Sequence, residues 1–340
     1  MAPRTIAAVL VSVGAVLTAL LPARHPEPAA HGKAAAFRVG LVFDVGGRGD
    51  KSFNDSAWLG LDRAQRELGV TTEIVEPSGA EDREAAMRLF AARHFDLVIG
   101  VGFIFSTDMN VVARDFPSTD FACIDYFPPS DGRIPNNVAG LVFREEEGSF
   151  LVGAVAGLVS HNKAVGFVGG MDVPLIRKFE AGYTAGVHYV CPACRVHAAF
   201  AGTTPEAFKD PAKGEALATS QISAGADVIF HASGTTGLGV FEAAHDMGVS
   251  AIGVDSDQYD EMPGVVITSM VKRVDVVVYD VIDQTLHHQF EGGMHAFGLK
   301  DDGIGYVDSG PHAAKIPDDV KARVAAIRTK VIDGEITVPR

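Results

Sequence analysis

Short apolar runs alternate with amphipathic stretches along most of the chain. The apolar runs are continuous and end in Gly, Asp or Pro, which is typical of strands buried on both faces. They predict two sets of five strands, at residues 37–43, 72–75, 97–101, 121–125 and 138–143, and at 164–168, 196–200, 228–230, 251–254 and 265–269. Strands that alternate with helices form parallel sheets covered on both faces. The pattern therefore predicts an α/β protein with two lobes of similar design.

Amphipathic stretches predict the helices between these strands. They cover residues 54–68, 81–93, 109–115, 145–160, 174–189, 214–223, 238–247, 273–290 and 317–333. Three segments, 143–145, 269–271 and the Gly-rich 292–310, are expected to cross between the lobes, because short extended or Gly-rich segments suit a hinge. The expected boundaries are 37–143 and 270–292 for the first lobe, 144–269 and 305–340 for the second, and 293–304 for a hinge crossover.

The first 36 residues follow a different pattern. Arg4 precedes an apolar run at residues 5–21, and a Pro/Ala-rich stretch continues to Ala36. A basic start, an apolar run and small residues downstream are typical of a secretory signal. The alternative is a retained membrane anchor, although the run is short for a span of about 20 residues. No cysteine lies near the end of the apolar run, so we expect a periplasmic protein without a lipid anchor.

Composition and charge exclude several classes of function. The chain of 340 residues has 29 Lys and Arg against 43 Asp and Glu, which gives a net charge of −14. This charge repels phosphate backbones, so we expect no nucleic-acid partner. Hydrophobic residues make up 47% of the chain, which fits an ordinary globular protein and excludes a disordered one.

Three cysteines are too few for a disulfide scaffold. Cys191 and Cys194 lie between a predicted helix and a predicted strand. A metal site there would need more ligands than His188 and His197 offer, so we expect a small disulfide in an exported chain. Cys123 lies within an apolar strand and is expected to be a buried free thiol. We expect neither a metal nor a cofactor.

Acidic residues and glycines gather where the predicted strands end. Asp44, Gly102 and Asp125 follow strands of the first set, and Gly234 and Asp255 follow strands of the second. Ligands of open α/β sheets bind outside the carboxyl ends of the strands. Two lobes that face each other would bring these residues into one shared cleft.

Six ordered motifs resemble those of the basic membrane protein family. The first comprises residues 43–47, 50–54 and 57–61, and the others lie within 100–108, 169–183, 233–239, 253–258 and 268–272. These proteins are substrate-binding components of ABC importers, similar to the bacterial purine nucleoside receptor. The resemblance runs from about Phe37 to the C-terminus. Most relatives are lipoproteins, and this chain differs because it lacks the lipid-bearing cysteine.

The resemblance implies a type I periplasmic binding protein, with two Rossmann-like lobes joined by a three-stranded hinge. It also implies eight ligand-binding residues. The base would lie between Phe53 and Phe179, its edge would bind Asn54 and Asp108, and the ribose would face Asp44, Gly234, Asp255 and Lys272. Lys272 would be the counter-charge of Asp255. We expect a purine nucleoside as ligand, an ABC transporter permease as partner, and a monomer.

Other functions stay open on the sequence alone. Within the same class, the ligand would instead be riboflavin, a sugar or another small molecule, or the protein would serve a chemoreceptor or sensor. A nucleoside hydrolase would need an aspartate-rich metal site, and Asp44 is the one carboxylate of its segment. A transcription factor would need a helix-turn-helix where the apolar leader lies. We therefore expect a binding protein and no enzyme.

Overall fold

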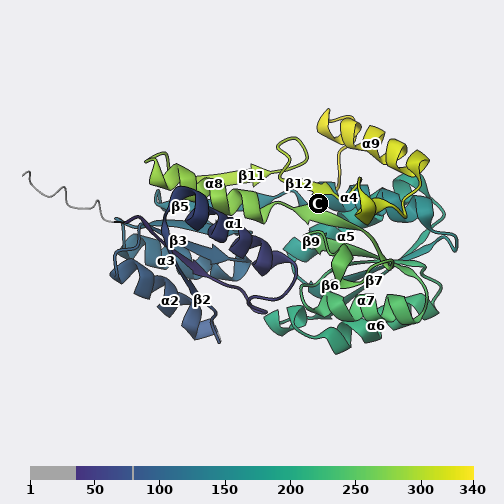
Figure 1. Cartoon of the computed structure of the whole chain (residues 1–340), viewed down its shortest axis with the longest axis horizontal. Coiled ribbons are helices and arrows are strands. Elements are labelled where there is room, and N and C mark those ends of the chain that lie inside the picture. The colour runs from purple at the N-terminus through teal and green to yellow at the C-terminus, as the bar shows by residue number, and fades with distance from the viewer. Residues whose placement is uncertain (1–35, 79) are drawn as a thin grey trace, which may run out of the picture. The chain divides into compact units, whose positions relative to one another are not determined.

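The computed structural model describes residues 36–78 and 80–340 of the chain (Figure 1). In residues 37–340 the first sheet contains β1 (Arg38–Val42), β2 (Thr71–Val75), β3 (Leu97–Val101), β4 (Asp120–Ile124), β5 (Val138–Phe143) and β11 (Gly293–Phe297). Their order is β11-β5-β4-β3-β1-β2, and neighbouring strands are parallel.

The second sheet repeats this arrangement. It contains β6 (Ala164–Met171), β7 (Arg195–Gly202), β8 (Val228–Ala232), β9 (Ser250–Asp255), β10 (Val266–Lys272) and β12 (Ile304–Tyr306). The order is β12-β10-β9-β8-β6-β7, with β12 antiparallel to β10 and the other pairs parallel. Because the two orders match, β4 and β5 correspond to β9 and β10. The predicted α/β fold with two similar lobes is confirmed.

Helices pack in pairs against both sheets. The helices of the described residues are α1 (Phe53–Leu68), α2 (Ala80–Ala92), α3 (Ser106–Asp115), α4 (Glu145–Val159), α5 (Pro174–Val190), α6 (Pro211–Ser223), α7 (Thr236–Asp246), α8 (Val274–Leu286) and α9 (Asp318–Ile332). In the first lobe α1 packs with α8 and α2 with α3, and in the second α4 packs with α5 and α6 with α7. The α9 helix lies against α4.

Successive residues of β1 explain why the apolar runs are continuous. Leu41 packs in one core cluster with Ala57 and Leu61 of α1. Val42 packs in another cluster with Met87 of α2. Since neighbouring side chains of a strand point to opposite faces, both faces of this sheet are buried under helices.

Three segments connect the two sheets. The first joins β5 to α4, the second joins β10 to α8, and the third joins β11 to β12. The second crossing comes after Lys272 rather than at residues 269–271, because β10 continues to Lys272. The segment expected as a hinge crossover, 293–304, begins with β11, which pairs with β5. This strand lies at the edge of its sheet and alternates between exposed and half-buried residues, so it lacks the apolar run of a central strand.

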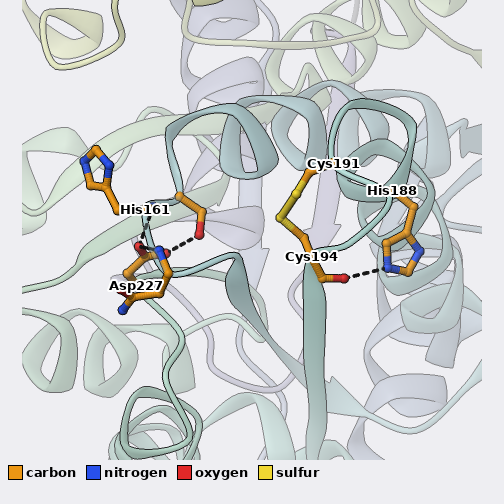
Figure 2. The surroundings of a disulfide bond; sticks show 7 residues. His161, His188, Cys191, Cys194 and Asp227 are labelled. Atoms are coloured by element: carbon orange, nitrogen blue, oxygen red, sulfur yellow. Dashed lines mark hydrogen bonds between the residues drawn. A yellow bond between two sulfur atoms is a disulfide. The ribbon is translucent and has the colours of Figure 1, made fainter.

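A disulfide lies at the amino ends of the strands of the second sheet. Cys191, after α5, is joined to Cys194, before β7, and the His188 ring contacts the Cys194 carbonyl at 3.1 Å (Figure 2). The structure places Cys123 in β4 as a buried free thiol.

The leader falls outside the described residues. The structure describes only Ala36 of the expected signal or anchor at residues 1–36, so this segment stays an expectation. Among the described residues, no helix combines the length and apolar character that a membrane span needs.

Candidate ligand-binding site

A cavity of about 590 Å³, including its opening to solvent, lies between the two lobes at the carboxyl ends of the strands. The first lobe contributes Asp44, Val45, Asp50, Phe53, Asn54, Gly102, Phe103 and Asp125. The second sheet and its helices contribute Leu175, Ile176, Phe179, Phe208, Ala232, Ser233, Gly234, Thr235, Val254, Asp255 and Lys272.

The structure brings together seven of the eight residues expected at the ligand. They are Asp44, Phe53, Asn54, Phe179, Gly234, Asp255 and Lys272. Asp108 is the exception, because it lies in the first turn of α3 and is not among the lining residues. The described residues contain no group of three or more His, Cys, Asp or Glu placed to hold a metal ion.

The loop before α1 fixes the start of that helix. The Asp50 carboxylate accepts hydrogen bonds from the backbone N–H groups of Ser52, Asn54 and Asp55, at 3.0, 2.8 and 3.1 Å. N–H groups at a helix start lack a carbonyl partner within the helix, so this carboxylate caps α1. The Asn54 side chain donates to Asp50 Oδ2 and accepts from the Asp44 N–H, both at 3.0 Å. The start of α1 is thereby tied to the end of β1.

Asp44 is a half-buried carboxyl group at the end of β1. Its Oδ1 accepts a hydrogen bond from the Val45 N–H at 2.6 Å. Gly102 packs against the other oxygen, where a Cβ would collide with Asp44 Oδ2, so this position requires glycine. Burial raises the pKa of Asp44 to about 7, and the nearby carboxylates of Asp125 and Asp50 act in the same direction.

Asp125 and Asp255 occupy equivalent positions in the two lobes, after β4 and at the end of β9. Their φ angles are 61° and 64°, in the left-handed region that Asp tolerates better than most residues. Burial raises the pKa of Asp125 to about 6 and that of Asp255 to about 7, although Lys272 opposes both shifts. Such backbone conformations occur preferentially at binding sites, where the surrounding structure enforces them.

Lys272, the last residue of β10, neutralises part of this negative charge. Its Nζ donates to Asp125 Oδ1 at 2.6 Å and lies 3.2 Å from Glu145 Oε1. Burial by itself would lower the pKa of Lys272, but the carboxylates of Asp125, Glu145 and Asp255 raise it above its usual value. The direct counter-charge is therefore Asp125, and not Asp255 as expected. The sequence does not distinguish the two aspartates, since they follow equivalent strands.

Aromatic rings line the cavity from both lobes. Phe53 begins α1 in the first lobe, and Phe179 lies on α5 in the second. Lys272 Nζ lies 4.9 Å from the centroid of the Phe53 ring and 5.9 Å from that of Phe179. Phe103, after β3, and Phe208, before α6, add two further rings. Flat apolar walls beside a buried charge cluster suit a ligand with an aromatic part and a polar part.

Four acidic or aromatic lining residues were not among the eight expected ligand contacts: Asp50, Phe103, Asp125 and Phe208. Of these, Asp125 was expected in the shared cleft but was not assigned to the ligand. Asp125 carries the same signal as Asp255, because each is an aspartate at the end of a buried strand. Phe103 directly follows Gly102 after such a strand. Phe208 has no comparable signal, since it lies in the connection between β7 and α6 and reaches the cavity through the fold.

A cleft lined by two similar lobes, with three connections between them, defines a two-lobed ligand-binding protein of the periplasmic binding protein type I class. Residues 37–340 match the family described as ABC transporter substrate-binding protein PnrA-like, and the chain belongs to this family. The resemblance in the sequence motifs is thereby confirmed.

Known relatives agree with this membership. The ABC transporter nucleoside-binding protein BmpA of Lactococcus lactis is 30% identical, over 100% of this chain and 99% of that protein. An uncharacterized lipoprotein of Pyrococcus horikoshii is 35% identical, over 80% of this chain and 69% of its own length. The crystal structure of an ABC transporter solute-binding protein from Aeropyrum pernix has a TM-score of 0.81 at 31% identity, covering 89% of this chain and 94% of that one.

Family membership places the protein outside the cytoplasm, as the substrate-binding component of an ABC transporter. Its partners are accordingly a small-molecule ligand and a permease. The Pyrococcus horikoshii relative is named a lipoprotein, whereas we expect this chain to carry no lipid. In this sequence the first cysteine is Cys123, within the first lobe.

Proposed function

We propose that this substrate-binding protein takes a purine nucleoside into the cleft and delivers it to its ABC permease. One observation carries the proposal: Asp255 is 8% exposed, and its Oδ1 has no hydrogen-bond partner among the described residues. The other oxygen, Oδ2, accepts a hydrogen bond from Ser52 Oγ at 2.9 Å. A buried acceptor without a partner is unfavourable, so a ligand hydroxyl that donates to Oδ1 would be favoured.

The rest of the cavity suits the two parts of a nucleoside. Phe53 and Phe179 offer apolar faces from opposite lobes, and stacking on such rings is worth about 1–3 kcal/mol per base. A ribose carries vicinal hydroxyls, which donate well to a carboxylate such as Asp255. The Lactococcus lactis relative is a nucleoside-binding protein by name, which supports the same ligand class.

A thermal-shift panel tests the ligand class. The protein is unfolded in denaturant, dialysed free of small molecules, refolded, and heated with inosine, adenosine, guanosine, hypoxanthine, riboflavin or sugars. A ligand that binds the folded state raises the melting temperature by mass action, equivalent to about 2.7 kcal/mol at a concentration of 100 Kd. We expect the nucleosides to give the largest shifts. A shift with riboflavin or a sugar, and none with nucleosides, would contradict the proposal.

We also propose that the leader is a cleaved signal, and that the mature chain is a monomer without lipid that starts between Arg24 and Phe37. The apolar run at residues 5–21 and the small residues after it support cleavage. N-terminal sequencing and intact mass of the exported protein test this. An intact Met1 with retention in the membrane would support the anchor instead.

A further inference from the structure

A segment of the first lobe reaches across the cleft to the end of β9. Ser52 Oγ lies 2.9 Å from Asp255 Oδ2. In the opposite direction, Ser256 Oγ donates to the Ser52 carbonyl, and Gln258 Nε2 donates to the Lys51 carbonyl, both at 3.1 Å. Each of these hydrogen bonds joins residues more than 200 positions apart in the chain, and none lies in the three connecting segments.

Ser52 and Asp255 form the strongest bond of this set. Ser52 is fully buried, and its hydroxyl has a single hydrogen to donate. The alternative acceptor is the Val254 carbonyl, at 3.1 Å. An ionised carboxylate is the better acceptor, because charge-assisted hydrogen bonds are about twice as strong as neutral ones. The hydroxyl therefore serves the carboxylate when Asp255 is ionised.

Gln258 is held in place from within the second lobe. Its side-chain Oε1 accepts a hydrogen bond from the Val254 N–H at 2.8 Å, and His231 Nε2 lies 3.0 Å from the same oxygen. Burial lowers the pKa of His231 to about 4, so the ring is neutral at physiological pH. Since Oε1 is fixed within the second lobe, Nε2 is directed towards the Lys51 carbonyl without a partner from the first lobe being needed to orient it. This side of the contact is preorganised.

We propose that residues 51–52 and 255–258 form a latch that holds the lobes together around the ligand, with Ser52 as the positioning residue. Ser52 binds one oxygen of Asp255 and thereby directs the other oxygen, Oδ1, to the ligand. Ligand binding and lobe closure then depend on the same carboxylate. The ligand's identity in this inference rests on the proposed function, whereas the latch between the lobes does not.

The latch acts on release of the ligand more than on its capture. Opening of the cleft breaks the hydrogen bonds of Ser52, Ser256 and Gln258 together, because each has one partner in each lobe. Capture occurs while the cleft is open, when these bonds are not formed. Loss of a latch bond is therefore expected to raise the dissociation rate and to leave the association rate nearly unchanged.

Stopped-flow kinetics with inosine test whether the latch changes the dissociation rate and not the association rate. We expect Ser52→Ala to raise the dissociation rate roughly ten-fold or more, since it removes a charge-assisted bond. The effect on the free base hypoxanthine is expected to be smaller, because Asp255 Oδ1 has no ribose to bind. Ser256→Ala removes a neutral bond that does not involve Asp255, so it is expected to affect inosine and hypoxanthine equally and more weakly.

Ser56→Ala is the matched control. Ser56, a buried serine in α1, lies four residues after Ser52. Its Oγ accepts a hydrogen bond from the Asp275 N–H at 3.1 Å, and both Ser56 and Asp275 belong to the first lobe. We expect this variant to lose some thermal stability and to keep the parent dissociation rate. Equal dissociation rates for Ser52→Ala and Ser56→Ala would overturn the latch.

A second measurement tests, without any ligand, whether the latch holds the lobes together. Spin labels on Leu89→Cys of α2 and Met247→Cys after α7 report the distance between the lobes, since both positions are exposed. We expect Ser52→Ala to lower the fraction of closed molecules below that of the parent and of Ser56→Ala. Identical distance distributions in all three proteins would refute the latch. Failure of inosine to bind would refute the proposed nucleoside and leave this comparison decisive.

Discussion

Three aspartates of the cleft have three different tasks, and their surroundings assign them. The Asp50 carboxylate caps α1, because it accepts hydrogen bonds from three backbone N–H groups at the start of that helix. Asp125 is paired with Lys272 at 2.6 Å and contributes to the charge balance of the cleft. Asp255 keeps one oxygen without a partner among the described residues. The residue type is the same in each case, so the role follows from which donors the fold brings to each carboxylate.

The role of Asp255 gives the first prediction. We expect Asp255→Asn to weaken inosine binding by about 1.5–3 kcal/mol, the usual worth of a hydrogen bond to a charged group. Binding of hypoxanthine is expected to change little, because the free base has no ribose hydroxyls. Calorimetric titrations at pH 8, above the pKa of about 7, keep the parent carboxylate ionised. Asp301→Asn, at an exposed turn, is the control. Unchanged inosine affinity would refute the ribose assignment.

Phe53 gives the second prediction. Its ring is half-buried and lines the cavity, so truncation disturbs the core less than truncation of the buried Phe179. We expect Phe53→Ala to weaken inosine and hypoxanthine alike by about 1–3 kcal/mol, because both lose a stacking face. Phe290→Ala, a half-buried phenylalanine outside the cavity lining, is the control and is expected to bind as the parent does. A loss confined to inosine would mean that Phe53 contacts the sugar.

At the scale of elements, the sequence predicts those strands whose burial leaves a continuous apolar run in the chain. The central strands of both sheets are predicted because each is buried on both faces, as β3 is along its whole length. The edge strand β11 is missed because its residues alternate between exposed and half-buried positions among glycines. The edge strands β2 and β7 are also exposed or half-buried but are predicted, because β2 keeps β-branched residues and β7 keeps a short apolar run.

The same physics explains which site residues the sequence identifies. Residues at strand ends, such as Asp44 and Asp255, carry a local signal and lie in the cavity. Phe208 carries none, because the packing of its connection against the second sheet brings it there. Asp108 is an acidic residue close to the end of β3, but it lies in the first turn of α3 and is not among the lining residues. Proximity in the sequence to a strand end is therefore informative but not sufficient.

The disulfide gives a prediction at this scale. Cys191 and Cys194 close a loop of four residues, for which chain entropy gives about 2 kcal/mol at most. We expect the double variant Cys191→Ser/Cys194→Ser to lose up to that amount in denaturant unfolding and to bind ligand as the parent does. The reason is that the bond lies at the amino ends of the strands, whereas the cavity lies at their carboxyl ends. Mass spectrometry of non-reduced peptides detects the bond directly, and free thiols there would contradict it.

At the scale of the whole molecule, charge links the two lobes across the cleft. Asp125 follows β4 in the first lobe, Lys272 ends β10 of the second sheet, and Glu145 begins α4 directly after the first crossing. Carboxyl groups of both lobes are buried around this one ammonium group. The stability of the folded protein should therefore depend on pH well above the range in which exposed aspartates titrate.

Asp44 allows a test of this pH dependence. Its pKa rises from the usual 3.8 to about 7, so its contribution to stability is full below about pH 4 and is lost as the pH rises to 7. Such a shift is equivalent to about 4 kcal/mol, and we expect about half of it because water reaches part of the side chain. The stability of Asp44→Asn relative to the parent should therefore increase between pH 4 and pH 8, as measured by denaturant unfolding. A constant difference across this range would contradict the raised pKa.

The most direct test of the central claim is a calorimetric titration of the refolded, ligand-stripped protein with inosine, hypoxanthine and ribose. The cavity offers stacking faces and an unpartnered carboxylate oxygen together, so both parts of a nucleoside should be needed for tight binding. We predict one inosine bound per chain, and roughly ten-fold or more weaker binding of hypoxanthine or ribose alone, which corresponds to the loss of about 1.4 kcal/mol or more. Absence of heat with inosine, adenosine and guanosine, together with one-to-one binding of riboflavin or a sugar, would contradict it.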